Sequence, residues 1–218
     1  MTKFSKKAGA NQQRIDSIID AAETVILKKG YDNSTFTDFA EVANYNKRTI
    51  YLYFKNKDDI FAAVTYRVLD KIELFIQKKV IAQENGLTNL QNIVWGYYTF
   101  FLSNPKYFSL LWTLEERYFV PNKEEEYASH ILKSFEKRKS AISIIRETYH
   151  KGLNDGSIKK TLNPELLITL LWSQTLGVLQ VISKSIEYLA SELSIDHQKL
   201  FELHVNTATA ILTKEIEI

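Results

Sequence analysis

Two adjacent basic residues, Lys47 and Arg48, stand among hydroxyl and aromatic side chains that can contact nucleic acid. They belong to the run Asn-Lys-Arg-Thr-Ile-Tyr-Leu-Tyr at residues 46–53. Arg and Lys donate hydrogen bonds to guanine O6 and N7, and Tyr and Thr hydroxyls bind phosphates or base edges. The run therefore predicts a DNA-binding surface.

Two short helices joined by a tight polar turn are expected to position this run. Thr35 suits the N-cap of the first helix, because Asp38 three residues later completes a capping box. Asn44 falls at the turn, where Asn tolerates the left-handed conformation better than most residues. Asn46 suits the N-cap of a second helix that runs through Tyr53. The two basic residues then lie in the first turn of the second helix, as in the recognition helix of a helix-turn-helix.

The composition is that of an ordinary soluble globular protein. The 218 residues are 45% hydrophobic and 25% charged, and cysteine is absent, which excludes disulfides and thiolate metal sites. The N-terminus lacks the apolar stretch of a signal peptide, and the most apolar window, 166–182, is interrupted by polar residues. We therefore expect a cytoplasmic protein without a membrane segment.

Charge is distributed unevenly along the chain. Residues 1–57 hold ten Lys or Arg against six Asp or Glu, whereas the remainder holds eighteen against twenty. A basic first quarter on a near-neutral body is typical of a phosphate-binding head, although four charges are a weak signal alone.

The rest of the chain also shows helical periodicity and helix-stop signals. Apolar residues at spacings of three and four predict an amphipathic helix over 11–29, which Gly30 ends. Further helices are predicted over 57–82, 88–103, 106–119, 124–152, 164–190 and 196–215. The predicted fold is all-α: an N-terminal three-helix helix-turn-helix domain joined through a long helix to a helical ligand-binding and dimerisation domain.

Over residues 14–64 the sequence resembles the TetR family of bacterial transcriptional regulators. The resemblance is carried by Arg14, Ile18, Ala21-Ala22, Gly30-Tyr31, Thr35, Ala40, Thr49-Ile50-Tyr51, Tyr53-Phe54, Lys57 and Ile60-Phe61. The turn departs from the family's usual Gly-Val-Ser, since this chain has Asn44-Tyr45-Asn46. Arg48 stands where the family often has a small residue, so an operator borrowed from relatives would be in doubt.

The resemblance implies a DNA-binding domain over 1–57, with a basic N-terminal arm of Lys3, Lys6 and Lys7. The residues expected at or near DNA are Thr35, Thr37, Asn46, Lys47, Arg48, Thr49, Tyr51, Tyr53 and Lys57. Arg48 as a base reader or as a phosphate contact stays open. Lys57 begins the long helix, where a cation and a helix N-terminus both favour phosphate. Ile50 and Phe54 are expected in the core.

For residues 58–218 the resemblance implies an effector-binding and dimerisation domain. The homodimer would form through the helices over 164–190 and 196–215, both rich in apolar residues. An unknown small-molecule effector would bind among aromatic residues, for which the candidates are Trp95, Tyr98, Phe101, Phe108, Trp112, Glu115, Tyr118 and Trp172. The Glu115-Glu116 pair could meet a cationic ligand, or it could be a solvated surface pair.

Other classes of protein explain the sequence less well. Glu147-x-x-His150 has the spacing of a di-iron helix bundle, but no second such pair is present. We therefore predict no enzymatic activity, no metal and no cofactor. A protein-partner adaptor is disfavoured by the intact basic and aromatic set at 47–57. A repressor is favoured over an activator only because the resembled family more often represses.

Overall fold

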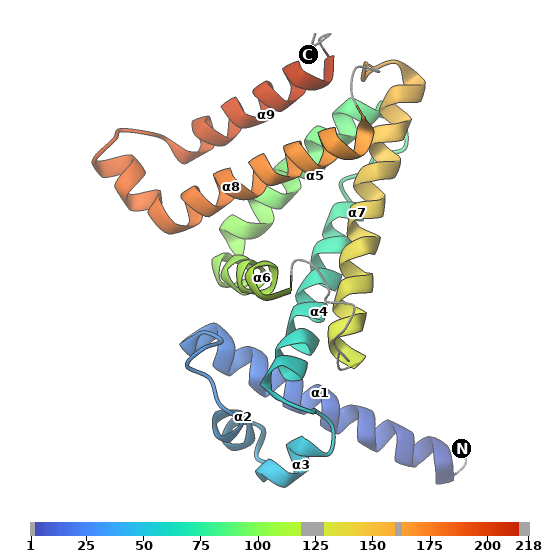
Figure 1. The fold of residues 1–218 in the computed structure, drawn as a ribbon, viewed down its shortest axis with the longest axis vertical. Coiled ribbons are helices and arrows are strands. Elements are labelled where there is room, and N and C mark those ends of the chain that lie inside the picture. The colour runs from blue at the N-terminus through green and yellow to red at the C-terminus, as the bar shows by residue number, and fades with distance from the viewer. Residues whose placement is uncertain (1–2, 119–128, 160–162, 214–218) are drawn as a thin grey trace. The chain divides into compact units, whose positions relative to one another are not determined.

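A computed structural model describes residues 3–118, 129–159 and 163–213 of the chain. Every regular element in these residues is a helix (Figure 1), which confirms the predicted all-α fold. The helices are α1 (Lys3–Lys29), α2 (Phe36–Ala43), α3 (Lys47–Tyr51), α4 (Lys57–Gln77), α5 (Gly86–Ser103), α6 (Pro105–Tyr118), α7 (Ser129–Asp155), α8 (Pro164–Ser191) and α9 (His197–Thr213).

By packing, the chain divides into two compact units. Unit 1 comprises residues 1–70 and 106–138, and unit 2 comprises residues 71–105 and 139–218. Unit 1 therefore holds α1, α2, α3, most of α4, nearly all of α6 and the start of α7. Unit 2 holds α5, α8, α9 and the rest of α7. The predicted division at residue 57 concerns function rather than packing, and it stays a prediction.

In unit 1 the local signals for helix ends act as the sequence predicts. Gly30 follows α1 with φ of +81°, a left-handed conformation that favours glycine. Thr35 caps α2 and forms the capping box with Asp38. Ile18 and Phe39 are fully buried where α2 packs on α1. These contacts fix the platform on which α3 lies.

Two helix ends in unit 1 differ from the prediction. The backbone of α1 begins at Lys3 rather than near Asn11, so the basic arm is continuous with that helix. The third helix ends at Tyr51 rather than at Tyr53. The N–H groups of Leu52 and Tyr53 bond to carbonyls three residues back, at 3.3 and 2.9 Å, which tightens the last turn.

The end of α4 is also earlier than predicted, at Gln77 instead of Ala82. Asn89 on α5 is fully buried and holds the connecting segment in a non-helical path. Its side-chain oxygen accepts from the N–H of Ile81 at 2.8 Å, and its amide nitrogen donates to the carbonyl of Ile81 at 2.9 Å. Because this pairing satisfies backbone groups that a helix would otherwise satisfy, the chain leaves α4 early.

In unit 2 the first residue of α5 lies against the end of α7. A Cβ atom on Gly86 would stand 2.1 Å from the backbone nitrogen of Gly152, which no real side chain tolerates. The N–H of Gly86 donates to Asp155 Oδ2 at 2.8 Å. Backbone therefore touches backbone at this crossing, and an acidic side chain of α7 caps α5.

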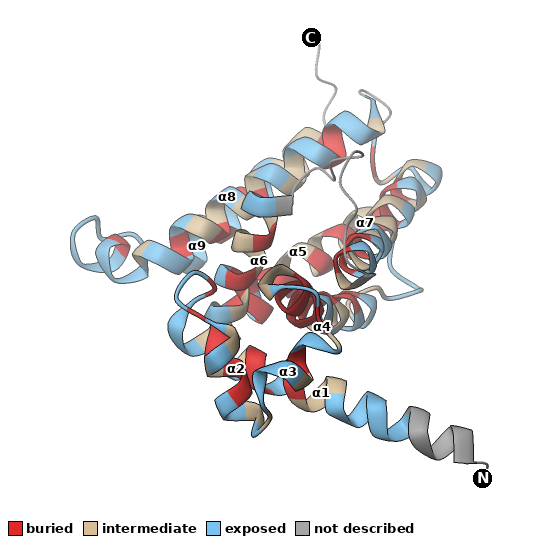
Figure 2. Ribbon diagram, turned by 60° about the horizontal axis from the view of Figure 1, so that its bottom comes forward, coloured by how far each residue is buried: buried red, intermediate tan, exposed pale blue. Residues whose placement is uncertain are grey.

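The last two helices of unit 2 form an antiparallel pair beside α5 (Figure 1). Leu167, Leu179 and Phe201 are buried in this arrangement. Exposed stretches (pale blue in Figure 2) alternate with buried ones along α8, and several of the exposed residues are apolar. Leu166 is 62% exposed, and Leu203 on α9 is 63% exposed.

Within the described residues, α8 is the one helix long and apolar enough to cross a membrane. Its most apolar window has a mean hydropathy of 1.6, and only 22% of that window is buried inside the chain. No membrane segment was predicted, because polar residues interrupt the apolar run over 166–182. Length and composition alone are weak evidence that α8 inserts into a membrane. An exposed apolar side of this kind is typical of a surface that binds a partner.

Candidate functional site

The turn between α2 and α3 has the predicted geometry. Asn44 adopts the left-handed conformation, with φ of 56° and ψ of 41°. Asn46 caps α3, since its side-chain oxygen accepts from the N–H of Thr49 at 2.8 Å and from the Thr49 hydroxyl at 3.0 Å. Both asparagines thus act as predicted, and together they set the direction of the first turn of α3.

Lys47 and Arg48 are both exposed in this first turn. Neither side chain has a hydrogen-bond or ion-pair partner within the described residues. Ile50 and Phe54, by contrast, are fully buried, as predicted. The short helix is therefore anchored by its apolar side and presents two free cations on the other, which is the arrangement that phosphates and guanine edges require.

The two tyrosines of the run brace α3 as well as facing solvent. The ring of Tyr51 stacks on Phe36 with centroids 4.5 Å apart, yet 57% of Tyr51 stays exposed. The Tyr53 hydroxyl donates to Asn11 Oδ1 on α1 at 3.3 Å. The same hydroxyl lies beside Arg14 and raises the pKa of that guanidinium. Arg14 is thus a further cation beside the run, and its place on the exposed side of α1 gave no signal of this in the sequence.

Two threonines of the predicted contact set lie at the start of α2. The Thr35 hydroxyl accepts from the N–H of Asp38 at 3.2 Å and donates to its carboxylate at 2.9 Å, so it is already used in the cap. Hydrogen bonds from Lys29 and then from Thr35 lower the pKa of Asp38. Thr37 is exposed in the first turn. Of the two, Thr37 has the freer hydroxyl for a phosphate.

Lys57 is more tightly held than the resemblance implies. Its Nζ donates to the carbonyl oxygens of Tyr31, Asp32 and Ser34 at 3.0, 3.3 and 3.3 Å. The same ammonium lies 4.1 Å from the centre of the Tyr31 ring. A phosphate contact by this side chain would have to replace one of these bonds, whereas Lys47 and Arg48 need break none.

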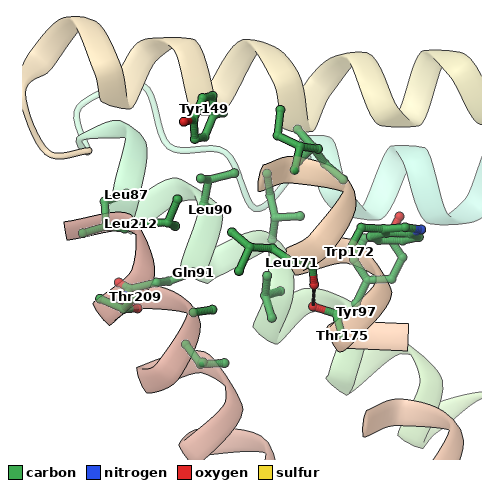
Figure 3. Close-up of a pocket in the computed structure, with 16 residues that line it drawn as sticks. Leu87, Leu90, Gln91, Tyr97, Tyr149, Leu171, Trp172, Thr175, Thr209 and Leu212 are labelled. Carbon is green, nitrogen blue, oxygen red and sulfur yellow. Dashed lines mark hydrogen bonds between the residues drawn. The ribbon is translucent and has the colours of Figure 1, made fainter. Parts of the chain in front are cut away.

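Unit 2 contains a cavity of about 70 Å³ between α5, α7, α8 and α9 (Figure 3). Its walls are almost entirely apolar, and they contain no Asp, Glu, Lys, Arg or His among the described residues. The lining residues are Leu87, Leu90, Gln91, Ile93, Val94, Tyr97, Ile145, Tyr149, Ile168, Leu171, Trp172, Thr175, Val205, Ala208, Thr209 and Leu212.

Most polar groups on these walls are already paired. Gln91 Nε2 donates to the Thr209 hydroxyl at 2.8 Å, and the Thr175 hydroxyl lies 2.9 Å from His204 Nε2. Burial lowers the pKa of His204, which favours the neutral imidazole. The Tyr149 hydroxyl is different, because it is buried and has no hydrogen-bond partner in the part of the chain that is described.

The eight predicted effector residues do not form one cluster within either unit. Of them, only Trp172 lines the cavity. Trp95 and Tyr98 instead pack on Phe201, with centroids 5.2 and 4.5 Å apart, and Phe101 is buried. Aromatic content marked these helices, but it could not tell which face of α5 each ring occupies.

The other predicted effector residues lie on α6 in unit 1. Phe108 is buried there. Trp112 Nε1 donates to Glu116 at 2.7 Å, and Glu115 lies 3.3 Å from Arg138, while burial raises the pKa of Glu115. The side chain of Tyr118 lies outside the described residues. Both glutamates therefore have partners within unit 1, which leaves little for a cationic ligand.

The remote alternative of a di-iron site rested on Glu147 and His150. The Glu147 carboxylate accepts from the Ser143 hydroxyl at 3.0 Å. No group of three or more His, Asp or Glu in the described ranges is placed to hold a metal ion.

The geometry of α2, the turn and α3 defines a helix-turn-helix protein. Residues 18–64 match the family model described as bacterial regulatory proteins, tetR family. The chain belongs to this family, which confirms the resemblance.

Relatives are similar mainly over the N-terminal part. The fatty acid metabolism regulator protein of Bacillus subtilis is 41% identical over 71 residues, which are 31% of this chain and 37% of that protein. The transcriptional repressor NicS of Pseudomonas putida is 27% identical over 116 residues, which are 50% of this chain and 53% of that protein. The chain thus spans between about a third and a half of these relatives. They are regulators rather than enzymes, in agreement with the non-enzymatic prediction.

Solved structures share the fold over nearly the whole chain. FadR of Bacillus subtilis in complex with stearoyl-CoA has a TM-score of 0.65 at 18% identity, covering 90% of this chain and 98% of that one. SmeT, the repressor of a Stenotrophomonas maltophilia multidrug efflux pump, has a TM-score of 0.65 at 17% identity, covering 92% and 90%. At these identities the likeness concerns the fold alone.

Proposed function

We propose that this chain is a transcriptional regulator that reads DNA with α3. The observation that carries the proposal is the pair Lys47 and Arg48, both exposed and unpartnered among the described residues, on a helix whose start is fixed by two asparagine side chains. Free cations at the start of a short, anchored helix suit base edges in the major groove. Exposed Thr37 and Tyr51, together with Arg14 beside Tyr53, are proposed to contact the DNA backbone.

The proposed form on DNA is a homodimer on a pseudo-palindromic operator. One helix of five residues reads few base pairs, so useful specificity needs two copies. The exposed apolar side of α8, with Leu166, Leu170 and Val181, together with Leu203 on α9, offers a surface for a second copy. Burying that surface in a dimer, rather than in a lipid bilayer, fits a chain whose head binds DNA. Sedimentation of detergent-free protein as a dimer would support this choice, and recovery only with membranes would contradict it.

The proposed mode of action is repression relieved by a small molecule. NicS and SmeT carry the name of repressor, and the FadR structure holds stearoyl-CoA, which are properties of those proteins. In this chain the cavity of unit 2 is the proposed effector site. Binding there releases DNA only if the effector prefers the DNA-free form, because a ligand with equal affinity for two states shifts nothing.

The deciding experiment is a salt titration of DNA binding. The full chain is titrated onto DNA from immediately upstream of its own gene and onto random DNA of equal length. We expect tighter binding to the upstream DNA, with affinity falling steeply as salt rises, because each neutralised phosphate releases counterions. Equal and weak binding to the two DNAs would contradict autoregulation by this protein, and the same titration on a genomic fragment library would then show whether any site is bound.

A further inference from the structure

The cavity of unit 2 restricts the charge of any molecule that enters it. Leu90, Leu171 and Leu212 are typical of its walls, and no ionisable carboxylate, amine, guanidinium or imidazole lines it within the described residues. An ion buried there would lose its hydration without gaining a counter-charge, which is a large free-energy cost. The walls therefore select against anions and cations.

One polar group on the cavity wall, the Tyr149 hydroxyl, is an unpaired hydrogen-bond donor among the described residues. Tyr149 is only 1% exposed, it lines the cavity, and its hydroxyl has no partner among the described residues. Figure 3 shows it at the end of the lining where Leu87, Leu90 and Leu212 gather, with Trp172 and Tyr97 at the other end. Buried hydroxyls are nearly always paired in native proteins, so a lone one marks a position that a ligand or a water completes.

We propose that this cavity binds an uncharged, mainly hydrocarbon molecule with one acceptor oxygen, such as a ketone or an alcohol, and that the Tyr149 hydroxyl donates a hydrogen bond to that oxygen. The regulatory meaning of this binding rests on the proposed function, but the binding itself does not. An apolar cavity of roughly 150 Å³ accommodates benzene. At about 70 Å³ this one fits a short or narrow molecule unless its walls move apart.

The test uses 2-pentanone, pentanoate and pentylammonium as probes, because they share a five-carbon skeleton and differ in charge. Binding to the DNA-free full chain is measured by calorimetry and by saturation-transfer NMR at pH 7.5. We expect 2-pentanone to bind and the two ions to bind at least 10-fold more weakly. Equal or tighter binding of pentanoate or pentylammonium would overturn the proposal, as would the failure of 2-pentanone to bind.

The role of the hydroxyl is tested with Tyr149→Phe, which keeps the ring. We expect the affinity for 2-pentanone to fall roughly 3- to 10-fold, the effect of one hydrogen bond, while cyclopentane binding stays the same. Tyr66→Phe removes a hydroxyl from unit 1 and serves as the matched control. The ligand-free variant should be as stable as the wild type or more so, because the substitution removes an unpaired buried hydroxyl. A clear drop in its Tm would show that the hydroxyl is bonded within the protein, and that result would overturn its assignment to a ligand.

Release from DNA is measured separately on the same samples. If 2-pentanone binds in a Tyr149-dependent way but leaves the DNA complex intact, the assignment of the cavity stands and the proposed effector step fails. If DNA is bound site-selectively but no uncharged probe binds, the DNA-reading function stands and the assignment of the cavity fails.

Discussion

The proposed DNA-reading surface of unit 1, which is the first turn of α3 with Lys47 and Arg48, differs in its chemistry from the cavity of unit 2. The first is named the reading surface. On α3 the cationic side chains are exposed and have no partners among the described residues. The cavity walls are almost entirely apolar and at least partly buried, and the described lining residues carry no charge. If both proposals hold, DNA binding on α3 depends on released counterions, and ligand binding in the cavity depends on water leaving apolar surface. Salt should therefore weaken the first strongly and leave the second nearly unchanged.

The two regions also differ in what holds them. The reading surface is oriented by hydrogen bonds between residues close in sequence, such as those that Thr49 donates to Asn46. The cavity lies where α5, α7, α8 and α9 meet, so residues as far apart in sequence as Leu87 and Leu212 form its walls. Single substitutions on the reading surface should therefore alter the structure only nearby, whereas single substitutions around the cavity should alter several helices.

The largest expected effect follows from removing both free cations. The double variant Lys47→Ala, Arg48→Ala should lose about 2–6 kcal/mol of binding free energy on the preferred DNA, because each base-reading side chain contributes about 1–3 kcal/mol. Its salt dependence should flatten by about one unit of slope for each phosphate that the variant no longer neutralises. Filter binding over a range of salt concentrations measures both quantities. The control pair Lys78→Ala, Lys133→Ala removes two exposed cations that are not part of α3 and should leave affinity unchanged. An equal weakening by this pair would mean that only net charge matters.

A change at the α5–α7 crossing should affect stability without touching the reading surface. Gly86→Ala places a Cβ against the backbone of Gly152, so we expect the free energy of unfolding to fall by about 1–3 kcal/mol. Urea denaturation followed by circular dichroism measures this. The control Gly9→Ala meets nothing within 4 Å on α1 and should be neutral or stabilising. Equal effects of the two substitutions would contradict the close crossing.

Stability of unit 1 should depend on pH through Asp59. Burial acts to raise the pKa of this carboxyl, but hydrogen bonds from His130 and from the N–H of Lys55 outweigh it and lower the pKa. A lowered folded pKa means stabilisation that is present above the ordinary carboxyl value of about 3.9 and disappears as the pH falls through the folded value. Asp59→Asn should therefore cost about 1–2 kcal/mol at pH 7 and progressively less below about pH 4, measured by urea denaturation across pH. A difference that stays constant down to about pH 2 would exclude the ionised carboxylate as its cause.

The smallest expected effect comes from the cap of α3. Asn46→Ala removes the acceptor for the Thr49 N–H and should cost about 1 kcal/mol in the stability of this short helix. Amide hydrogen exchange of residues 47–51 measures the local change, and DNA affinity should fall with it. Asn46→Ser retains a capping oxygen and should restore most of the protection. If serine restored the protection but not the DNA affinity, the Asn46 amide itself would contact DNA.

The sequence predicted the features of the fold that depend on neighbouring residues, and it missed those that depend on residues further along the chain. Thr35, Asn44 and Asn46 act on neighbours within a few residues, and their roles were predicted and confirmed. The end of α4 was misplaced because Asn89, eight residues beyond Ile81, captures the backbone there.

The cavity was beyond sequence reasoning for a similar reason. Periodicity identified its helices but not which faces meet, so only Trp172 was among the predicted residues. Tyr149 carried no signal at all, because an unpaired hydroxyl is recognisable only when its surroundings are known.

The exposed apolar side of α8 has a consequence for gene dosage. If two copies must cover this side before DNA is read, the amount of active regulator depends on chain concentration more steeply than in simple proportion, by mass action. A cell that makes half as much protein would then keep less than half of the active form. Loss of one gene copy, or dilution during rapid growth, would then lower the occupancy of the promoter by more than the fall in total protein concentration.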